Sequence, residues 1–115
     1  MKKLLALVAL SLTPAWAAQP LSPRASTLFH ALLKDTAMRQ VKCPGGLGGS
    51  GTACATSPRG KAALQARIGK WPRWKQTDPW VKDGASFTSD GKDLYVVSVF
   101  KNVSGPGSLL VFTEF

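Results

Sequence analysis

The amino-acid sequence predicts an α+β domain: an N-terminal amphipathic helix and a short second helix packed on a small antiparallel sheet of three or four strands, with one disulfide. Three observations carry this prediction. Apolar residues recur at helical spacing after Ser22, the turn signal Asp90-Gly91 separates two β-rich runs, and two cysteines bracket a glycine-rich loop. Such a set of elements normally stacks its helices on one face of an antiparallel sheet.

The first 17 residues have the pattern of a secretion signal. A basic start, Lys2-Lys3, precedes a short apolar run, and a small-x-small cleavage signal ends at Ala17. The apolar run is too short to cross a bilayer, and no later stretch is long enough to do so. We therefore expect residues 1–17 to be a bacterial-type signal peptide and residues 18–115 to form one exported domain, periplasmic or secreted.

The first helix of this domain is expected to begin at Ser22, because Ser22-Pro23-Arg24 supplies an N-cap residue and a proline at the first helical position. His30, the single histidine, falls on the polar face of this helix and is expected to be solvated. The same tripeptide at residues 57–59 predicts a second, shorter helix that ends near Gly69. The predicted apolar face of the first helix consists of Ala25, Leu28, Phe29, Leu32, Leu33 and Ala37.

The loop between Cys43 and Cys54 admits three interpretations: a nucleotide site, a redox pair or a stapled turn. Gly46, Gly48 and Gly51 match G-x-G-x-x-G, but that site needs a strand before the glycines and a helix after them within a βαβ unit. A helical pattern precedes these glycines, and a catalytic thiol pair normally has the spacing C-x-x-C. We therefore expect a structural Cys43–Cys54 disulfide and no nucleotide cofactor; the loop itself is a candidate recognition element.

The β-rich runs predict a hairpin followed by a last strand over residues 108–115, with a candidate fourth strand around residues 74–77. A two-residue turn at Asp90-Gly91 would place Phe87 opposite Leu94. In this register Leu94, Val96, Ser98 and Phe100 share a face with Phe87. The other face carries Tyr95, Val97 and Val99.

The charge of the chain is strongly positive. Its 15 basic and 6 acidic residues give a formal net charge of +9, and removal of the leader with Lys2 and Lys3 lowers this by two. Such an excess in a small domain favours an anionic partner: nucleic acid, lipopolysaccharide, phospholipid headgroups or an acidic protein. The same excess would also serve solubility alone.

No catalytic residues are predicted. The acidic residues fall in no acid–base or glycosidase pattern, and no serine-hydrolase or metalloprotease motif occurs. One histidine and two paired cysteines do not make a metal site. The expectation is a protein without catalytic residues, cofactor or metal. The alternative is a small secreted hydrolase of an anionic polymer, with His30 and Glu114 supplying a base and an acid.

The segment richest in recognition chemistry follows the second predicted helix, where tryptophans alternate with cations. Aromatic rings flanked by positive charge stack bases and follow a phosphate backbone, and they also suit sugar rings or a lipid interface. The alternative is that these tryptophans are structural and cover the small hydrophobic core of the sheet. We expect a non-catalytic binding module whose candidate binding residues are Trp71, Arg73, Trp74, Lys75, Trp80 and Lys82.

A third function class is a subunit of a cell-envelope assembly. In the predicted register Tyr95, Val97 and Val99 form an apolar second face of the sheet, which would be the contact surface of such a subunit. Salt-sensitive binding would favour the binding module, and turnover would favour the hydrolase. Oligomers at low concentration would favour the assembly subunit.

Overall fold

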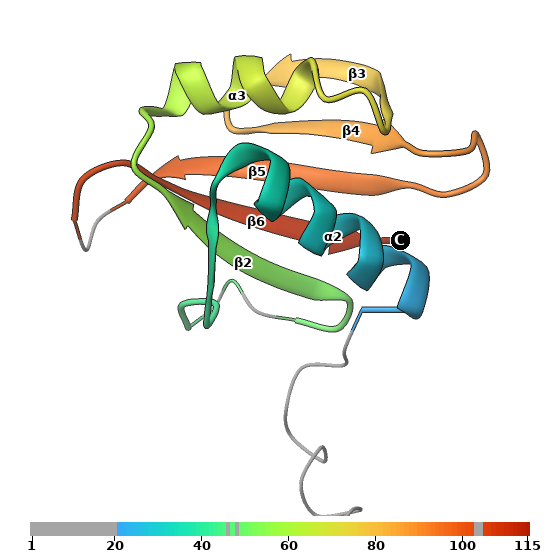
Figure 1. Ribbon diagram of the computed structural model, residues 1–115, viewed down its shortest axis with the longest axis horizontal. Helices are drawn as coiled ribbons and strands as arrows, with labels where there is room; N and C mark the ends of the chain where they lie inside the picture. The colour runs from blue at the N-terminus through green and yellow to red at the C-terminus, as the bar shows by residue number, and fades with distance from the viewer. Residues whose placement is uncertain (1–20, 46, 48, 103–104) are drawn as a thin grey trace, which may run out of the picture.

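The computed structural model describes residues 21–45, 47, 49–102 and 105–115. These residues form two helices, α2 (Pro23–Thr36) and α3 (Lys61–Gly69), and one antiparallel sheet in the order β1-β2-β6-β5-β4-β3. The strands are β1 (Arg39–Val41), β2 (Thr52–Ser57), β3 (Lys75–Val81), β4 (Gly84–Thr88), β5 (Tyr95–Lys101) and β6 (Ser108–Glu114). Both helices lie on one face of the sheet (Figure 1). Neither described helix is long and apolar enough to cross a membrane.

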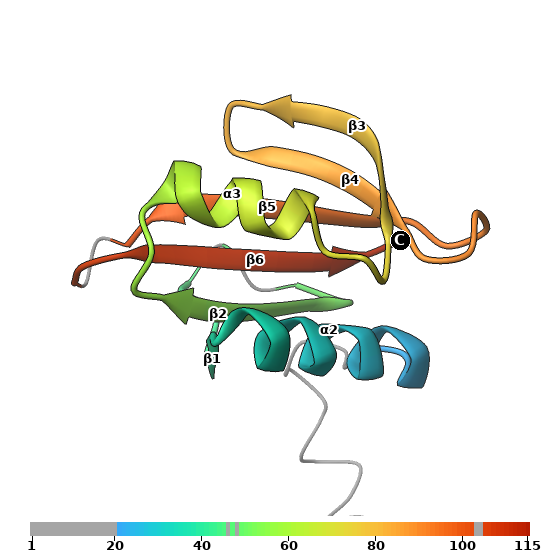
Figure 2. The ribbon, with the colours of Figure 1, turned by 45° about the horizontal axis from the view of Figure 1, so that its top comes forward.

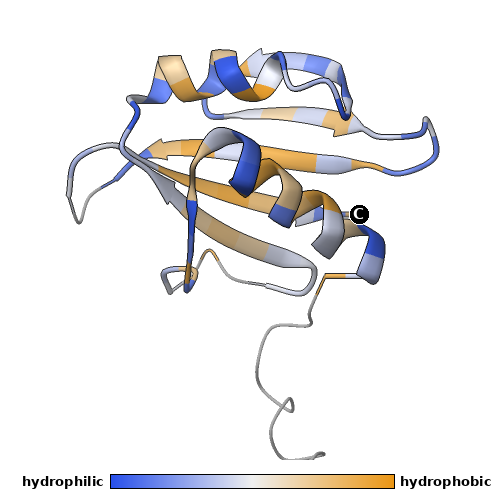
Figure 3. Ribbon diagram, viewed as in Figure 1, coloured by the Kyte–Doolittle hydropathy of each residue, from blue (hydrophilic) through white to orange (hydrophobic). Residues whose placement is uncertain are grey.

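The face of the sheet under the two helices, called here the helix face, carries the main core. Phe29 of α2 packs against Phe112 of β6, with ring centroids 5.3 Å apart. Trp74 stacks on Phe87 of β4, with ring centroids 4.3 Å apart and planes within 15°. Figure 3 shows the apolar residues concentrated along β5 and β6 and the hydrophilic ones in the β4–β5 loop. The strand residues of this core are Ala55, Ala85, Phe87, Tyr95, Val97, Val99, Leu110 and Phe112.

Helix α2 begins and ends through local backbone chemistry. The Ser22 hydroxyl accepts a hydrogen bond from the amide of Ala25, and Pro23 occupies the first turn, where its missing N–H costs nothing. At the other end, Ala37 adopts a left-handed conformation (φ 56°), and its amide donates to the carbonyl of Lys34. His30 lies on the exposed side of this helix.

The prediction of three or four strands is wrong, because the sheet has six. Strands β1 and β2 were missed: they flank the disulfide loop, where the sequence suggested only a helix end and a stapled turn. Because β2 follows the loop and pairs antiparallel with β1, the glycines do not stand in a βαβ unit. Gly46 and Gly48 of the glycine pattern, and the predicted signal peptide at residues 1–17, lie outside the described residues.

The second helix also begins later than predicted. Ser57 ends β2, and its hydroxyl accepts a hydrogen bond from the amide of Arg59, which makes a local turn rather than a helix cap. Helix α3 starts at Lys61, with Gly60 as an N-cap residue that supplies no side-chain hydrogen bond. The residues before the turn are held in β2 by pairing with β1 on one side and β6 on the other.

The predicted hairpin register is wrong by one residue. Strand β4 pairs with β5 through Phe87 opposite Tyr95 and Ala85 opposite Val97, so residues 89–94 form a longer loop than a two-residue turn. Because side chains alternate between faces, this shift exchanges the two faces of β5. Tyr95, Val97 and Val99 are therefore fully buried in the core rather than exposed on a second face.

The predicted disulfide between Cys43 and Cys54 is confirmed, with their Cα atoms 5.1 Å apart. It lies on the sheet face opposite the helices, called here the disulfide face. Cys54 packs there with Leu109 and Val111 of β6, and Val41, Cys43 and Phe100 pack against them. In the turned view both helices lie on the other side of the sheet from this face (Figure 2), so no described helix covers it.

Candidate functional site

The three tryptophans of the predicted binding segment are not presented together on the surface. Trp71 and Trp74 are each only 5% exposed, and their indole N–H groups donate to the Asp35 carboxylate (2.8 Å) and the Ile68 carbonyl (3.1 Å). Trp80 is half-buried and packs edge-on against the core. Burial with satisfied indole groups is the arrangement of structural tryptophans. Of the three tryptophans in this segment, Trp80 is therefore the one that could stack on a ligand.

The cations of the same segment are exposed but dispersed. Lys75 is the first residue of the edge strand β3, and Lys82 follows its last residue. Arg73 lines a shallow hollow of about 480 Å³ at the start of α2, where Arg24 also lies. Arg73 thus lies beside α2, whereas Lys75 and Lys82 lie at opposite ends of β3, so the three charges are not gathered around an aromatic platform.

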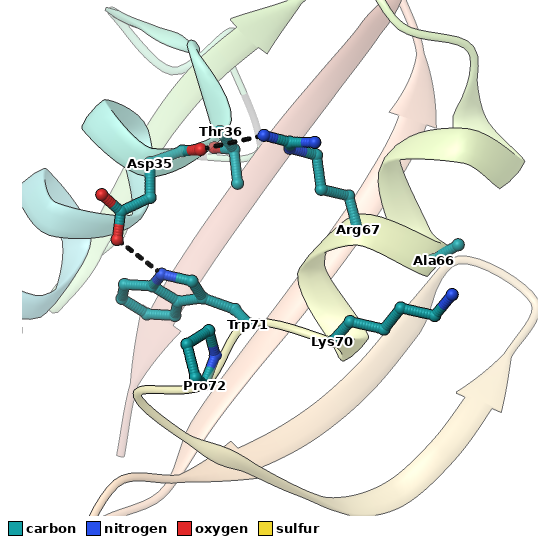
Figure 4. A pocket seen from close by; sticks show the side chains of 7 residues that line it. All are labelled: Asp35, Thr36, Ala66, Arg67, Lys70, Trp71 and Pro72. Carbon is teal, nitrogen blue, oxygen red and sulfur yellow. Dashed lines mark hydrogen bonds between the residues drawn. The ribbon is translucent and has the colours of Figure 1, made fainter.

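A cleft of about 620 Å³ lies between the C-terminal ends of α2 and α3. Figure 4 shows the Asp35 carboxylate bound to the indole of Trp71, while Arg67 reaches the Asp35 carbonyl at 3.1 Å. Arg59 donates to the next carbonyl, that of Thr36, at 2.7 Å. These donors satisfy the free carbonyls at the end of α2, which is a structural role. The Lys70 side chain extends away from this cluster.

Each of the six side-chain carboxylates accepts a hydrogen bond from another residue of the chain. Glu114, for example, accepts from both the amide and the hydroxyl of Ser22, at 2.9 and 2.5 Å, and so joins the last strand to the start of α2. Every aspartate accepts from at least one side chain: Trp71 to Asp35, Ser86 to Asp78, Lys61 to Asp83, Arg24 to Asp90, and Thr88 and Ser89 to Asp93. The acidic side chains therefore contribute hydrogen bonds to the fold, although Asp35, Asp78 and Asp90 remain exposed.

The positive charge is displayed to solvent instead. In the part of the chain that the structure describes, two cations form ion pairs: Arg24 with Asp90 and Lys61 with Asp83. The other cations have no carboxylate partner among the described residues. This imbalance gives the surface a positive potential that internal pairing does not cancel.

Three of these cations border a groove of about 600 Å³ on the disulfide face. Its floor follows one row of paired residues across the sheet, from Thr56 of β2 through Leu109 of β6 to Phe100 of β5. Its wall is formed by Val41, Lys42, Pro44 and Leu47, and the disulfide attaches this side of the groove to β2 through Cys43. Leu109 and Phe100 make most of the floor apolar, Thr56 and Asn102 add a hydroxyl and an amide to the lining, and none of the residues lining the groove is acidic.

The cations at the rim of this groove, Arg39, Lys42 and Lys101, are all exposed. They come from β1, the start of the disulfide loop and the end of β5. They are not among the binding residues predicted from the sequence, because they are separated by up to about sixty positions. They meet only through the pairing of β1 with β2, β2 with β6 and β6 with β5. No local motif marks them.

His30 and Glu114, the acid–base pair of the alternative hydrolase hypothesis, form hydrogen bonds with different partners. The imidazole of His30 contacts the Ser26 carbonyl at 2.7 Å and the Gln40 side chain at 3.2 Å. Glu114 is bound to Ser22. No hydrogen bond between the described residues joins His30 to Glu114, and no cluster of potential metal ligands occurs among the residues that the structure describes.

Comparison with known proteins adds no assignment: no family model, no curated protein and no solved structure matches this chain. The class of protein that fold and site define is a small disulfide-bonded α+β domain with a cationic surface. The groove on the disulfide face is its candidate functional site.

Proposed function

We propose that this protein is an exported, non-catalytic binding module for an anionic partner. One observation carries the proposal: every carboxylate is engaged by the fold, whereas most cations face solvent without a carboxylate partner. The excess of basic over acidic side chains gives such a surface a positive potential, which attracts anions at long range. The disulfide is compatible with export, since such bonds persist in oxidising compartments.

The test is binding to anions of different architecture at low ionic strength. Suitable probes are fluorescently labelled single-stranded DNA, polyphosphate, and vesicles containing phosphatidylglycerol, with phosphatidylcholine vesicles as the uncharged control. We expect saturable binding of at least one anionic probe that weakens steeply with salt, because each neutralised phosphate releases counterions. Absence of salt-sensitive binding to every probe would reject the proposal and leave the charge as an aid to solubility.

The variant His30→Ala distinguishes the hydrolase hypothesis from the binding hypothesis. His30 is exposed and makes only local contacts on α2 and with Gln40, so its loss should leave both the fold and anion binding unchanged. The measurement is circular dichroism together with the binding assay above. Loss of a turnover activity by a folded His30→Ala protein would support the hydrolase instead.

A further inference from the structure

We propose that the groove on the disulfide face binds a single-chain anionic amphiphile, with the anionic head at Arg39, Lys42 and Lys101 and the alkyl chain along the floor. This inference rests on the proposed function and names the ligand class of its candidate site. The groove combines an apolar floor with a cationic rim, and its volume of about 600 Å³ falls in the usual range of small-molecule sites.

The apolar part of the groove is built into the sheet. Leu109 is 9% exposed at its base, while Val41 and Phe100 are half-buried, and Leu47 is 39% exposed on the loop that forms the wall. Water in contact with these side chains would be released when an alkyl chain replaced it, which is favourable in proportion to the apolar area covered. The floor thus fits a hydrocarbon chain.

The cationic part lies at the rim of the same groove. Arg39, Lys42 and Lys101 supply three positive groups within its lining, and no carboxylate lines it. The long stems of these side chains extend the apolar walls while their charged ends remain in water. A molecule with a negative head and an apolar tail would satisfy both parts at once.

Other anionic ligands match the lining less well. Single-stranded nucleic acid is held by several stacking rings, and Phe100 is the one aromatic residue among those that line the groove. Thr56 and Asn102 can form hydrogen bonds, but the larger part of the exposed lining is apolar, and side chains such as Val41 and Leu109 offer no hydrogen bonds to bases or sugars. The chemistry of the lining therefore favours a hydrocarbon chain over a polymer of bases or sugars.

The disulfide makes this groove a preformed site. The bond from Cys43 to Cys54 attaches the wall of the groove to β2, whose Thr56 lies in the floor. The part of the wall next to this bond, Val41 and Lys42, is held in place before the ligand binds, which lowers the entropic cost of binding.

The experiment uses monomeric dodecyl phosphate as probe, measured by calorimetry and by amide chemical shifts, and compares it with inorganic phosphate and with dodecyl maltoside. We expect one saturable site for dodecyl phosphate, with shifts confined to the groove, and binding at least about tenfold weaker for both comparison probes. Equal binding of dodecyl maltoside would overturn the role of the cations. Binding only to anionic vesicles would indicate a membrane surface as the partner and would overturn the groove.

Two matched pairs of variants locate the site. The double variant Arg39→Gln/Lys42→Gln should weaken dodecyl phosphate binding about tenfold or more, while Lys34→Gln/Lys92→Gln, with the same change in net charge, should bind normally. Leu47→Glu places a carboxylate at the groove, and its control is Leu94→Glu, because Leu94 is similarly exposed (41%) in the β4–β5 loop. Equal losses within either pair would overturn the groove.

The outcomes separate the two proposals. Binding of polyphosphate or DNA without binding of dodecyl phosphate would reject the amphiphile site and leave the proposed anion-binding function intact. Failure of every anionic probe would reject both.

Discussion

The Asp93 carboxylate accepts several of the hydrogen bonds that hold the loop between β4 and β5. One of its oxygens accepts hydrogen bonds from the Thr88 hydroxyl at 2.7 Å and the Ser89 amide at 2.8 Å, and the other accepts from the Ser89 hydroxyl. Burial opposes ionisation of this group, but the hydrogen bonds from Ser89 and Thr88 outweigh it and hold the pKa of Asp93 well below its ordinary value. The loop that displaced the predicted two-residue turn is thus organised by a carboxylate.

Tyr95 begins the strand that follows this loop. Its hydroxyl is buried without a hydrogen-bond partner of ordinary geometry among the described residues, although the nearby Asp93 carboxylate still interacts with it. Burial first, and then Asp93, raise the pKa of Tyr95 to about 12. The phenol therefore stays neutral at physiological pH and acts as a core residue.

Replacing Asp93 with Asn should make stability less dependent on acid pH. A carboxyl whose pKa is lower in the folded than in the unfolded protein stabilises the fold fully above its unfolded value, near 3.8, and loses this contribution as the pH falls below it. We expect Asp93→Asn to lower the free energy of unfolding by about 1–3 kcal/mol at pH 7, because charge-assisted hydrogen bonds are lost. At pH 2 the difference should be smaller. Urea unfolding at both pH values measures this, and an equal difference at both would contradict the role of the carboxylate.

At the scale of elements, the turn that leads into β6 is fixed by contact with the end of β2. Gly107 has a positive φ of 88°, its carbonyl accepts a hydrogen bond from the Asn102 amide, and a Cβ atom there would collide with the carbonyl of Ser57. Next to it, the Ser108 hydroxyl donates to the Arg59 carbonyl at 2.8 Å. This turn therefore touches the turn between β2 and α3.

Replacing Gly107 with Ala should destabilise the protein far more than replacing Gly91. Both glycines have nearly the same φ, 88° and 86°, so both variants incur the left-handed penalty of about 1–2 kcal/mol. An added Cβ at Gly91 meets no atom within 4 Å, whereas at Gly107 it also lies 2.9 Å from the Cα of Pro58. We expect an additional loss of about 1–3 kcal/mol for Gly107→Ala, as in overpacked sites. Urea unfolding of both variants provides the measurement, and equal losses would show that the turn moves aside freely.

The elements predicted from the sequence are those with strong local signals. Ser22 and Pro23 mark the start of α2 by capping chemistry, and two cysteines in a short loop indicate their own pairing. Strand β1 has only three residues. Strand β2 has no aromatic residue and no Val or Ile, and its two threonines stand among small residues, so the sequence pattern indicated neither strand. At residues 57–59 a serine–proline pair made a turn, because Ser57 was already held in β2 by its neighbours.

At the scale of the whole molecule, β6 joins two parts of the chain. It lies between β2, from the first half, and β5, from the second-half meander, and its Glu114 binds Ser22 at the start of α2. The edge strand β3 carries Pro79 and irregular pairing near Asp78, features that discourage pairing with another chain. The groove on the disulfide face exists only through this long-range order, which is why the sequence predicted the charge of the surface but not the place of the site.

The hydrogen bonds between Ser22 and Glu114 lead to a prediction about the chain after removal of the predicted signal peptide. Cleavage after Ala17 leaves Ser22 and α2 intact, so a chain that starts at Ala18 keeps the N-cap and the contact with β6. Expressed with its leader in a bacterium and recovered from the periplasm, the protein should have an intact mass that begins at Ala18 and includes one disulfide. Alkylation without reductant should then add nothing to Cys43 or Cys54. Recovery of the uncleaved chain, or of alkylation adducts on both cysteines, would contradict export to an oxidising compartment. A mature chain that begins after Ser22 would contradict the structural role of the Ser22–Glu114 hydrogen bonds.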